Sequence, residues 1–243
     1  MASLKYIILK SKVVLAIMLH FYIYLEVFIK RKMRRDVSEK EIVKLQNKDF
    51  VIISNNCFGG QAYQWLNLPY NTPFVGLFLY GQCYIKLLQN FDFYLKQDLV
   101  FVTKSAYKDT IQAYPIALLY DVELHFLHYK TQHEVIDKWY RRLERLKEQI
   151  NYDNFFFQIS DQDLIDENII QTFHKLDFKN KLSFSAFDIE GLNNQQHVNV
   201  YKQYNQFKTC TPNGKKLFEI SFLYIDFVKW INTKTITRTR FKD

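Results

Sequence analysis

Residues 50–60 read Phe-Val-Ile-Ile-Ser-Asn-Asn-Cys-Phe-Gly-Gly, and this stretch decides the fold class of the chain. Its apolar start predicts a buried strand, and residues 61–66 (Gln-Ala-Tyr-Gln-Trp-Leu) are able to open a helix. A strand that passes through a glycine-containing turn into a helix is the building unit of α/β domains. The free N–H groups at such a helix start favour a bound anion or a thiolate.

Cys57 is therefore the leading candidate for a nucleophile. Two glycines, Gly59 and Gly60, allow a substrate to approach the backbone closely, and Asn55 and Asn56 are further candidate contacts. The helix start predicts a pKa of Cys57 below its ordinary range, and therefore fast alkylation at neutral pH. The competing explanation is a small buried cysteine beside a glycine-rich turn.

The pattern of a strand followed by a helix repeats along the chain. Further strands are predicted at residues 74–80, 99–103, 115–128, 154–159 and 182–187, and helices at 83–96, 131–150, 161–175 and 217–231. Thr131 and Glu134 have the spacing of a capping box, which predicts the start of the second helix. The sequence thus predicts an α/β three-layer domain over residues 48–243, with a mostly parallel or mixed central sheet.

Composition limits the class of protein. The chain has 243 residues, of which 48% are hydrophobic and 17% aromatic, enough for one full core and too apolar for disorder. Its three cysteines, Cys57, Cys83 and Cys210, form no C-x-x-C pair. We therefore expect no disulfide framework and no zinc knot, a reducing compartment, and ordinary or buried thiols at Cys83 and Cys210.

Positive charge is concentrated near the N-terminus. The chain carries a net charge of +8, and residues 1–50 hold eleven Lys or Arg against five Asp or Glu. The rest of the chain is almost neutral, which argues against a nucleic-acid-binding surface on the domain.

Residues 1–47 predict an apolar helix and a basic linker. Residues 13–29 are interrupted only by His20 and Glu26, and the run Lys-Arg-Lys-Met-Arg-Arg follows at 30–35. This arrangement predicts contact with anionic lipid at the cytoplasmic face of the membrane, either spanning it or lying in the interface. An amphipathic helix packed on the domain is the alternative.

A second cluster of ionisable groups lies at residues 121–129, which read Asp-Val-Glu-Leu-His-Phe-Leu-His-Tyr. Strand alternation places Asp121, Glu123 and His125 on one face. His128 lies at the end of the run, where it could turn toward a neighbouring loop. Either histidine is a candidate general base oriented by a carboxylate, and the two carboxylates could instead bind a divalent metal. An edge strand with a solvated polar face is the competing explanation.

Arg141 and Arg142, in the helix predicted at 131–150, are candidates for binding a phosphate or an acidic sugar. A solvated helix face with partners such as Asp137 and Glu144 is the alternative. Asp161 follows the strand predicted at 154–159 and is a further candidate contact. There is no P-loop, G-x-G-x-x-G, H-E-x-x-H or G-x-S-x-G motif, so no cofactor or bound metal is expected.

Several short motifs occur in a fixed order at residues 53–60, 68–78, 84–88, 114–116, 121–123, 128–129, 138–142 and 177–181. With them, residues 48–188 resemble a bacterial family that is catalogued as a domain of unknown function and met in exopolysaccharide and capsule biosynthesis. The resemblance implies a transferase acting on a sugar or a lipid-linked saccharide. The family often has Trp where this chain has Phe58, and an Arg-Asp step where it has Asp161-Gln162-Asp163, which weakens Asp161 as a catalytic residue.

Three functions follow as hypotheses. The first is a transferase of a glycosyl or acyl group, with Cys57 as nucleophile, the N–H groups near Gly59 and Gly60 as oxyanion donors, and a histidine as base. A retaining sugar transfer would instead use the carboxylates and leave Cys57 structural. The second is a papain-like cysteine hydrolase that uses Cys57 and His128, and the third is a non-catalytic, membrane-anchored scaffold. The first two require Cys57 and the 121–128 run to meet in one cleft, within about 10 Å.

Overall fold

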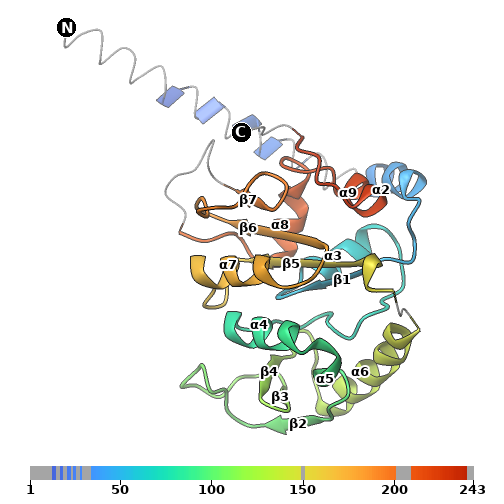
Figure 1. The fold of residues 1–243 in the computed structure, drawn as a ribbon, viewed down its shortest axis with the longest axis vertical. Helices are drawn as coiled ribbons and strands as arrows, with labels where there is room; N and C mark the ends of the chain where they lie inside the picture. Colours follow the sequence, from blue (N-terminus) through green and yellow to red (C-terminus); the bar gives the residue numbers. More distant parts are fainter. Residues whose placement is uncertain are drawn as a thin grey trace, which may run out of the picture.

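A four-stranded parallel sheet runs through the middle of the domain (Figure 1). The computed structural model describes residues 34–148, 151–200 and 209–239, together with nine isolated positions between 13 and 28. The strands lie in the order β1 (Val51–Ser54), β5 (Phe155–Ser160), β6 (Asn180–Ser185) and β7 (His197–Asn199). Every neighbouring pair is parallel, so the predicted α/β class is confirmed.

The sheet is covered on both faces, which gives the three predicted layers. One face carries α3 (Phe58–Trp65), α8 (Gly214–Ser221) and α9 (Phe227–Thr233). The other carries α4 (Gly81–Gln89), α5 (Phe91–Tyr94), α6 (Gln132–Lys147) and α7 (Glu167–Lys175). Successive side chains of β5 enter the two cores in turn: Phe155 and Phe157 pack in one, Phe156 in the other. A strand buried on both faces needs this unbroken apolar run.

A second sheet lies beyond α4 and α5, away from α8 and α9 (Figure 1). It is antiparallel, in the order β2 (Leu99–Val102), β3 (Ile116–Leu119) and β4 (Val122–His125). The single strand predicted at 115–128 is therefore a hairpin, which turns at Tyr120 with a φ of +60°. The strand predicted at 74–80 forms only a bridge between Phe78 and His125, because the backbone at Gly76 has a φ of +78°.

Most predicted helices are present, with different bounds. The predicted start of α6 at Thr131 is confirmed: Thr131 Oγ1 accepts the Glu134 N–H at 3.1 Å. Glu134 Oε2 accepts the N–H of Lys130, one residue before the cap, at 2.8 Å, and not that of Thr131 as a full capping box has it. The helix predicted at 161–175 begins only at Glu167, capped by Asp166, because Asp163 and Leu164 both have a positive φ. The helix predicted at 83–96 breaks at Asn90, and the one at 217–231 is the pair α8 and α9.

The N-terminal part of the chain is described at few positions. The nine positions between 13 and 28 are helical and exposed, and α2 (Arg34–Lys44) follows. The rest of the apolar stretch and the basic run up to residue 33 lie outside the described residues. In the described part of the chain, no helix has the length and apolar character needed to cross a membrane. Contact with a membrane surface stays a prediction.

Candidate active site

Cys57 and His128 meet at the carboxyl end of the parallel sheet. Cys57 is the residue directly before α3, and its Sγ lies 3.3 Å from Nε2 of His128. His128 follows β4 and is held by its N–H, which donates to the Gly76 carbonyl at 3.1 Å. The prediction that these two segments converge on one cleft is confirmed, because a thiol and an imidazole at this distance are within hydrogen-bond reach.

A cavity of about 310 Å³ opens beside the pair. It is lined by Cys57 and His128 together with Gln61, Lys138, Arg142 and Lys215, among others. Three of these side chains are cationic, and no carboxylate of the described residues is among the lining groups. The cavity therefore favours an anionic ligand.

The first turn of α3 is held by side chains that precede it. Ser54 Oγ accepts the Gly59 N–H at 2.9 Å, and Asn56 Oδ1 accepts the Phe58 N–H at 3.1 Å. These two N–H groups are thus satisfied within the protein. The prediction that Gly59 supplies an oxyanion donor is wrong. The described residues provide no backbone acceptor for the Gly60 N–H, and Gly60 lines the cavity.

Both glycines are closely packed. A Cβ at Gly59 would lie 3.0 Å from Ser54 Oγ and 3.3 Å from the carbonyl oxygen of Ile52, so a side chain there would force small shifts where α3 meets β1. A Cβ at Gly60 would lie 3.0 Å from Val75 Cγ1. Of the two predicted substrate contacts, only Gly60 lines the cavity.

Asn55 and Asn56 join the ends of β1 and β5. Asn55 Oδ1 accepts the Ser160 N–H at 3.1 Å, and the Asn55 carbonyl accepts the Leu79 N–H at 2.9 Å. Asn56 Nδ2 donates to Ser160 Oγ at 2.8 Å. Neither residue lines the cavity, and both support the turn.

The thiol of Cys57 is harder to ionise than predicted. Burial, and then the Asp163 carboxylate, raise the pKa of Cys57 to about 11. The predicted depressed pKa is wrong, because burial disfavours the thiolate and the Asp163 carboxylate lies nearby. The N–H groups of Phe58 and Gly59 are already bonded to Asn56 and Ser54. Burial also raises the pKa of Asp163 to about 6. At neutral pH Cys57 keeps its proton, and a nucleophilic role requires a base such as His128.

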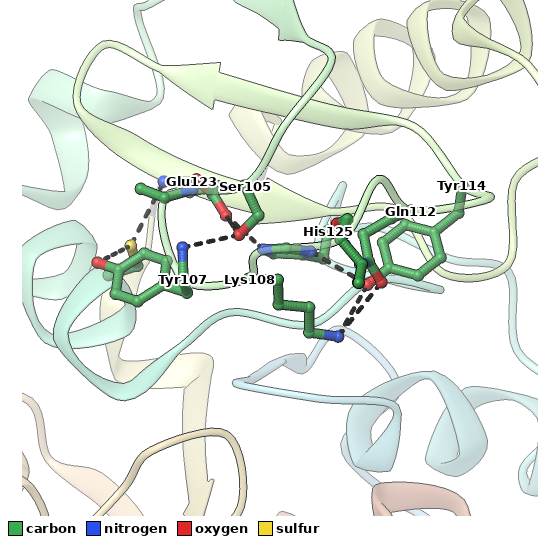
Figure 2. A network of polar contacts seen from close by, with 10 residues as sticks. Ser105, Tyr107, Lys108, Gln112, Tyr114, Glu123 and His125 are labelled. Atoms are coloured by element: carbon green, nitrogen blue, oxygen red, sulfur yellow. Dashed lines mark hydrogen bonds and ion pairs between the residues drawn. The ribbon is translucent and has the colours of Figure 1, made fainter.

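His125 and Glu123 belong to a separate, buried network (Figure 2). As strand alternation predicts, they share a face: His125 Nε2 lies 2.6 Å from Glu123 Oε1. Glu123 also accepts the Ser105 hydroxyl at 2.5 Å and the Ala106 N–H at 2.9 Å. Burial lowers the pKa of His125, and neither residue lines the Cys57 cavity. They are not the base and orienting acid of Cys57.

Asp121 lies in the turn between β3 and β4, at the opposite end of β4 from His125. Its carboxylate is exposed and bonds Lys86 at 3.0 Å and Tyr94 at 2.8 Å. It therefore orients no histidine and does not share a ligand with Glu123. No cluster of three or more His, Cys, Asp or Glu side chains capable of holding a metal occurs among the described residues.

The two neighbouring arginines have different surroundings. Arg141 is exposed and lies 3.9 Å from Asp137, as the solvated-face alternative proposes. Arg142 is buried and lines the cavity, because consecutive helical residues point about 100° apart. Only one of the two predicted binding arginines is at the site.

Asp161 holds two loops and not a ligand. Its carboxylate oxygens accept the N–H groups of Thr211 and Ala186, each at 2.7 Å, and its side chain is buried. It does not line the cavity. This structural role agrees with the departure from the family's Arg-Asp step, which weakened Asp161 as a catalytic candidate.

Several lining residues are absent from the sequence prediction as binding groups. Lys138 precedes Arg142 by four residues, so the helical period alone places both on one side of α6. Gln61 and Gly60 are neighbours in α3. Lys215 comes from α8, far along the chain, and no local pattern connects it with Cys57.

Comparisons with known proteins show which family the chain belongs to. Residues 28–232 match the model of a family described as a domain of unknown function (DUF1919). The chain is also 36% identical, over 209 residues, to a Haemophilus influenzae protein described as uncharacterized. That match covers 84% of this chain and 91% of the relative. The family match spans both the Cys57 turn and the α6 arginines, and the chain belongs to the DUF1919 family.

Proposed function

We propose that this protein is a cysteine-dependent acyltransferase. The observation that carries the proposal is the 3.3 Å approach of Cys57 Sγ to His128 Nε2 at the wall of a 310 Å³ cavity. A nucleophile within hydrogen-bond reach of a base, beside a space for the reacting group, is the arrangement that covalent catalysis requires.

The raised pKa of Cys57 determines the order of events. As Sγ attacks the acyl carbonyl, its proton passes to His128 Nε2, and a thioester forms when the donor's leaving group departs with that proton. In the second half, the acceptor hydroxyl loses its proton to His128 as its oxygen attacks the thioester. The Cys57 thiolate then leaves and recovers its proton from His128.

Two donors are placed to stabilise the oxyanion of each tetrahedral intermediate. The Gly60 N–H has no backbone acceptor within the described residues. The buried amide of Gln61 lines the cavity, and the described residues supply no hydrogen-bond partner for it. Donors that are fixed before the reaction stabilise developing charge without reorganisation.

The distribution of carboxylates favours acyl over glycosyl transfer. A retaining glycosyl transfer through carboxylates needs one carboxylate as nucleophile and a second acid close to it. Asp121 bonds Lys86 and Tyr94, Glu123 bonds His125 and Ser105, and neither is at the cavity. Cys57 is the nucleophile that the cavity offers.

The acceptor is proposed to be a hydroxyl of a sugar, free or lipid-linked, in surface-polysaccharide assembly. The support is the resemblance of the ordered series of motifs to a family met in that setting, and the cationic cavity suits an acidic or phosphorylated saccharide. The apolar and basic residues 1–35 would hold the enzyme at the cytoplasmic face of the membrane. Loss of sedimentation with anionic vesicles on deleting residues 1–35, with the domain still folded, tests this last point.

The acyl-enzyme is the species to look for. The full chain would be incubated with the small thioester S-acetyl-N-acetylcysteamine and analysed by intact mass and peptide mapping. We expect one acetyl group on Cys57, none in Cys57→Ala, an oxygen ester formed slowly in Cys57→Ser, and acetylation about a hundredfold slower in His128→Gln. Cys210→Ala, which removes the exposed thiol, is the matched control and should react like the wild type.

Acetylation that persists in Cys57→Ala would end the proposal. Methyl glycosides are then added as model sugar acceptors. Release of the acetyl group to water, and not to these acceptors, would indicate the papain-like hydrolase instead. In a deletion strain, restoration of the normal polysaccharide by Cys57→Ala would indicate a scaffold.

A further inference from the structure

Arg142 is a buried cation without an anion. Its side chain is 7% exposed, and among the described residues no carboxylate lies within ion-pair distance of it. Nη1 donates to the Tyr129 hydroxyl at 2.6 Å and lies 3.4 Å from the Val75 carbonyl. A buried charge is costly unless an opposite charge and hydrogen bonds compensate it.

The guanidinium is fixed in orientation by its neighbours. Its Cζ lies 4.7 Å from the centre of the Tyr70 ring, so the plane of the guanidinium is covered by an aromatic side chain. The Tyr129 hydroxyl accepts from Arg142 and donates to the Val75 carbonyl at 2.6 Å. The remaining N–H groups of Arg142 are bonded to no described residue, and Arg142 lines the cavity.

The other lining groups add charge and donors. Lys138 Nζ lies 5.3 Å from the centre of the Tyr129 ring, where Glu134 at 2.5 Å offsets part of its charge. Lys215 is exposed at the start of α8 and lines the same cavity. Gln61, 6% exposed, presents an amide that no described residue bonds. These lining side chains therefore favour a ligand with more than one negative charge.

We infer that the cavity is a phosphoryl-binding subsite and that Arg142 is its specificity-determining residue. The inference rests on the proposed function and extends it: the substrate of the Cys57 reaction carries a phosphate or diphosphate group next to the bond that reacts. A planar guanidinium with free N–H groups binds two oxygens of such a group at once, which a lysine does not do. Lys138 and Lys215 add point charges around it.

Binding is measured apart from catalysis. Cys57→Ala, which removes the nucleophile, is titrated calorimetrically with inorganic phosphate, pyrophosphate and acetate at constant ionic strength and pH 7.5. We expect phosphate and pyrophosphate to bind and acetate to bind at least about tenfold more weakly. In the wild type, the same two phosphate ligands should slow the alkylation of Cys57 by iodoacetamide.

Two neighbouring arginines provide the matched comparison. Adding Arg142→Lys to the Cys57→Ala chain keeps the charge but removes the paired donors, and should weaken phosphate binding about tenfold. Arg141→Lys, on the same helix, should leave it within about twofold. If Arg142→Lys does not fold, Lys215→Gln replaces it; this exposed change should weaken phosphate binding about threefold.

The inference is overturned if acetate binds as tightly as phosphate, or if Arg141→Lys weakens phosphate binding as much as Arg142→Lys does. It is also overturned if phosphate binding is unchanged in Arg142→Lys or, where that variant does not fold, in Lys215→Gln. Phosphate binding through Arg142 without any acetylation of Cys57 overturns the proposed acyl transfer and leaves the subsite standing. Acetylation of Cys57 without phosphate binding overturns the phosphoryl-binding subsite and leaves the proposed acyl transfer standing.

Discussion

Two histidines three positions apart, His125 and His128, have opposite surroundings. His125 is fully buried, stacks on Phe78 with ring centres 4.5 Å apart, and bonds Glu123 and Tyr114. Lys108 and Ser105 extend that network, so its polar groups are occupied by one another (Figure 2). His128 is exposed, and its imidazole contacts the thiol of Cys57 beside an open cavity.

The surroundings of the two histidines indicate a structural role for His125 and a chemical role for His128. A satisfied buried network stabilises one arrangement of the chain. A pair beside a cavity keeps donors and acceptors available for a substrate. The acid–histidine pair has the closer contact of the two regions, yet it holds the long loop at residues 103–115 onto the second sheet and reaches no cavity-lining group of the Cys57 site.

The largest expected difference between the two regions is in stability, and it is tested by removing one side chain from each. Glu123→Ala deletes the acceptor of Ser105, Ala106 and His125, and should lower the free energy of unfolding by about 3 kcal/mol. His128→Gln should change it by less than about 0.5 kcal/mol, because its side chain is exposed. Urea denaturation followed by circular dichroism measures both; a costly His128→Gln would make the two regions alike.

A smaller effect is expected at the acid beside Cys57. The Asp163 carboxylate raises the pKa of Cys57, so Asp163→Asn should lower that pKa and speed alkylation by iodoacetamide several-fold between pH 8 and 9. Asparagine tolerates the positive φ at this position. Asp137→Asn, on the exposed face of α6, is the control and should leave the rate unchanged. A rate that does not rise in Asp163→Asn would show that burial alone sets the pKa.

The smallest effect is expected at the exposed acid of the second sheet. Asp121→Asn weakens an exposed ion pair with Lys86 and should cost less than about 1 kcal/mol of stability. Acetylation of Cys57 should be unchanged, because Asp121 does not line the cavity. A large loss of acetylation in Asp121→Asn would show that Asp121 takes part in the Cys57 reaction. It would contradict the assignment of Asp121 to the second sheet alone.

Local patterns were sufficient for much of the fold. The unbroken apolar run at β1 and the cap at Thr131 determine a buried strand and a helix start from neighbouring residues alone. The start of α7 was missed, because the left-handed backbone at Asp163 and Leu164 depends on how this turn packs against the Gly81 end of α4.

The site was predictable where it follows from topology. Cys57 follows a parallel strand, and the fold brings its turn to the His128 segment. The raised pKa of Cys57 was not predictable, because it depends on the burial of the thiol in the folded chain and on Asp163, more than a hundred residues away. The N–H groups of Gly59 and Phe58, which could have stabilised a thiolate, instead donate to Ser54 and Asn56. The choice between Arg141 and Arg142 likewise required knowing which side of α6 faces the cavity.

The hydrogen bonds between residues 75–78 and 125–129 fix the position of His128 along the chain. Phe78 and His125 exchange two backbone hydrogen bonds, the His128 N–H bonds the Gly76 carbonyl, and Tyr129 bonds the Val75 carbonyl. Adding or deleting one residue between His125 and His128 would carry the imidazole away from Cys57 while leaving both sheets intact. Natural variation in length is therefore expected in the loop at 103–115 and not in this interval of three residues.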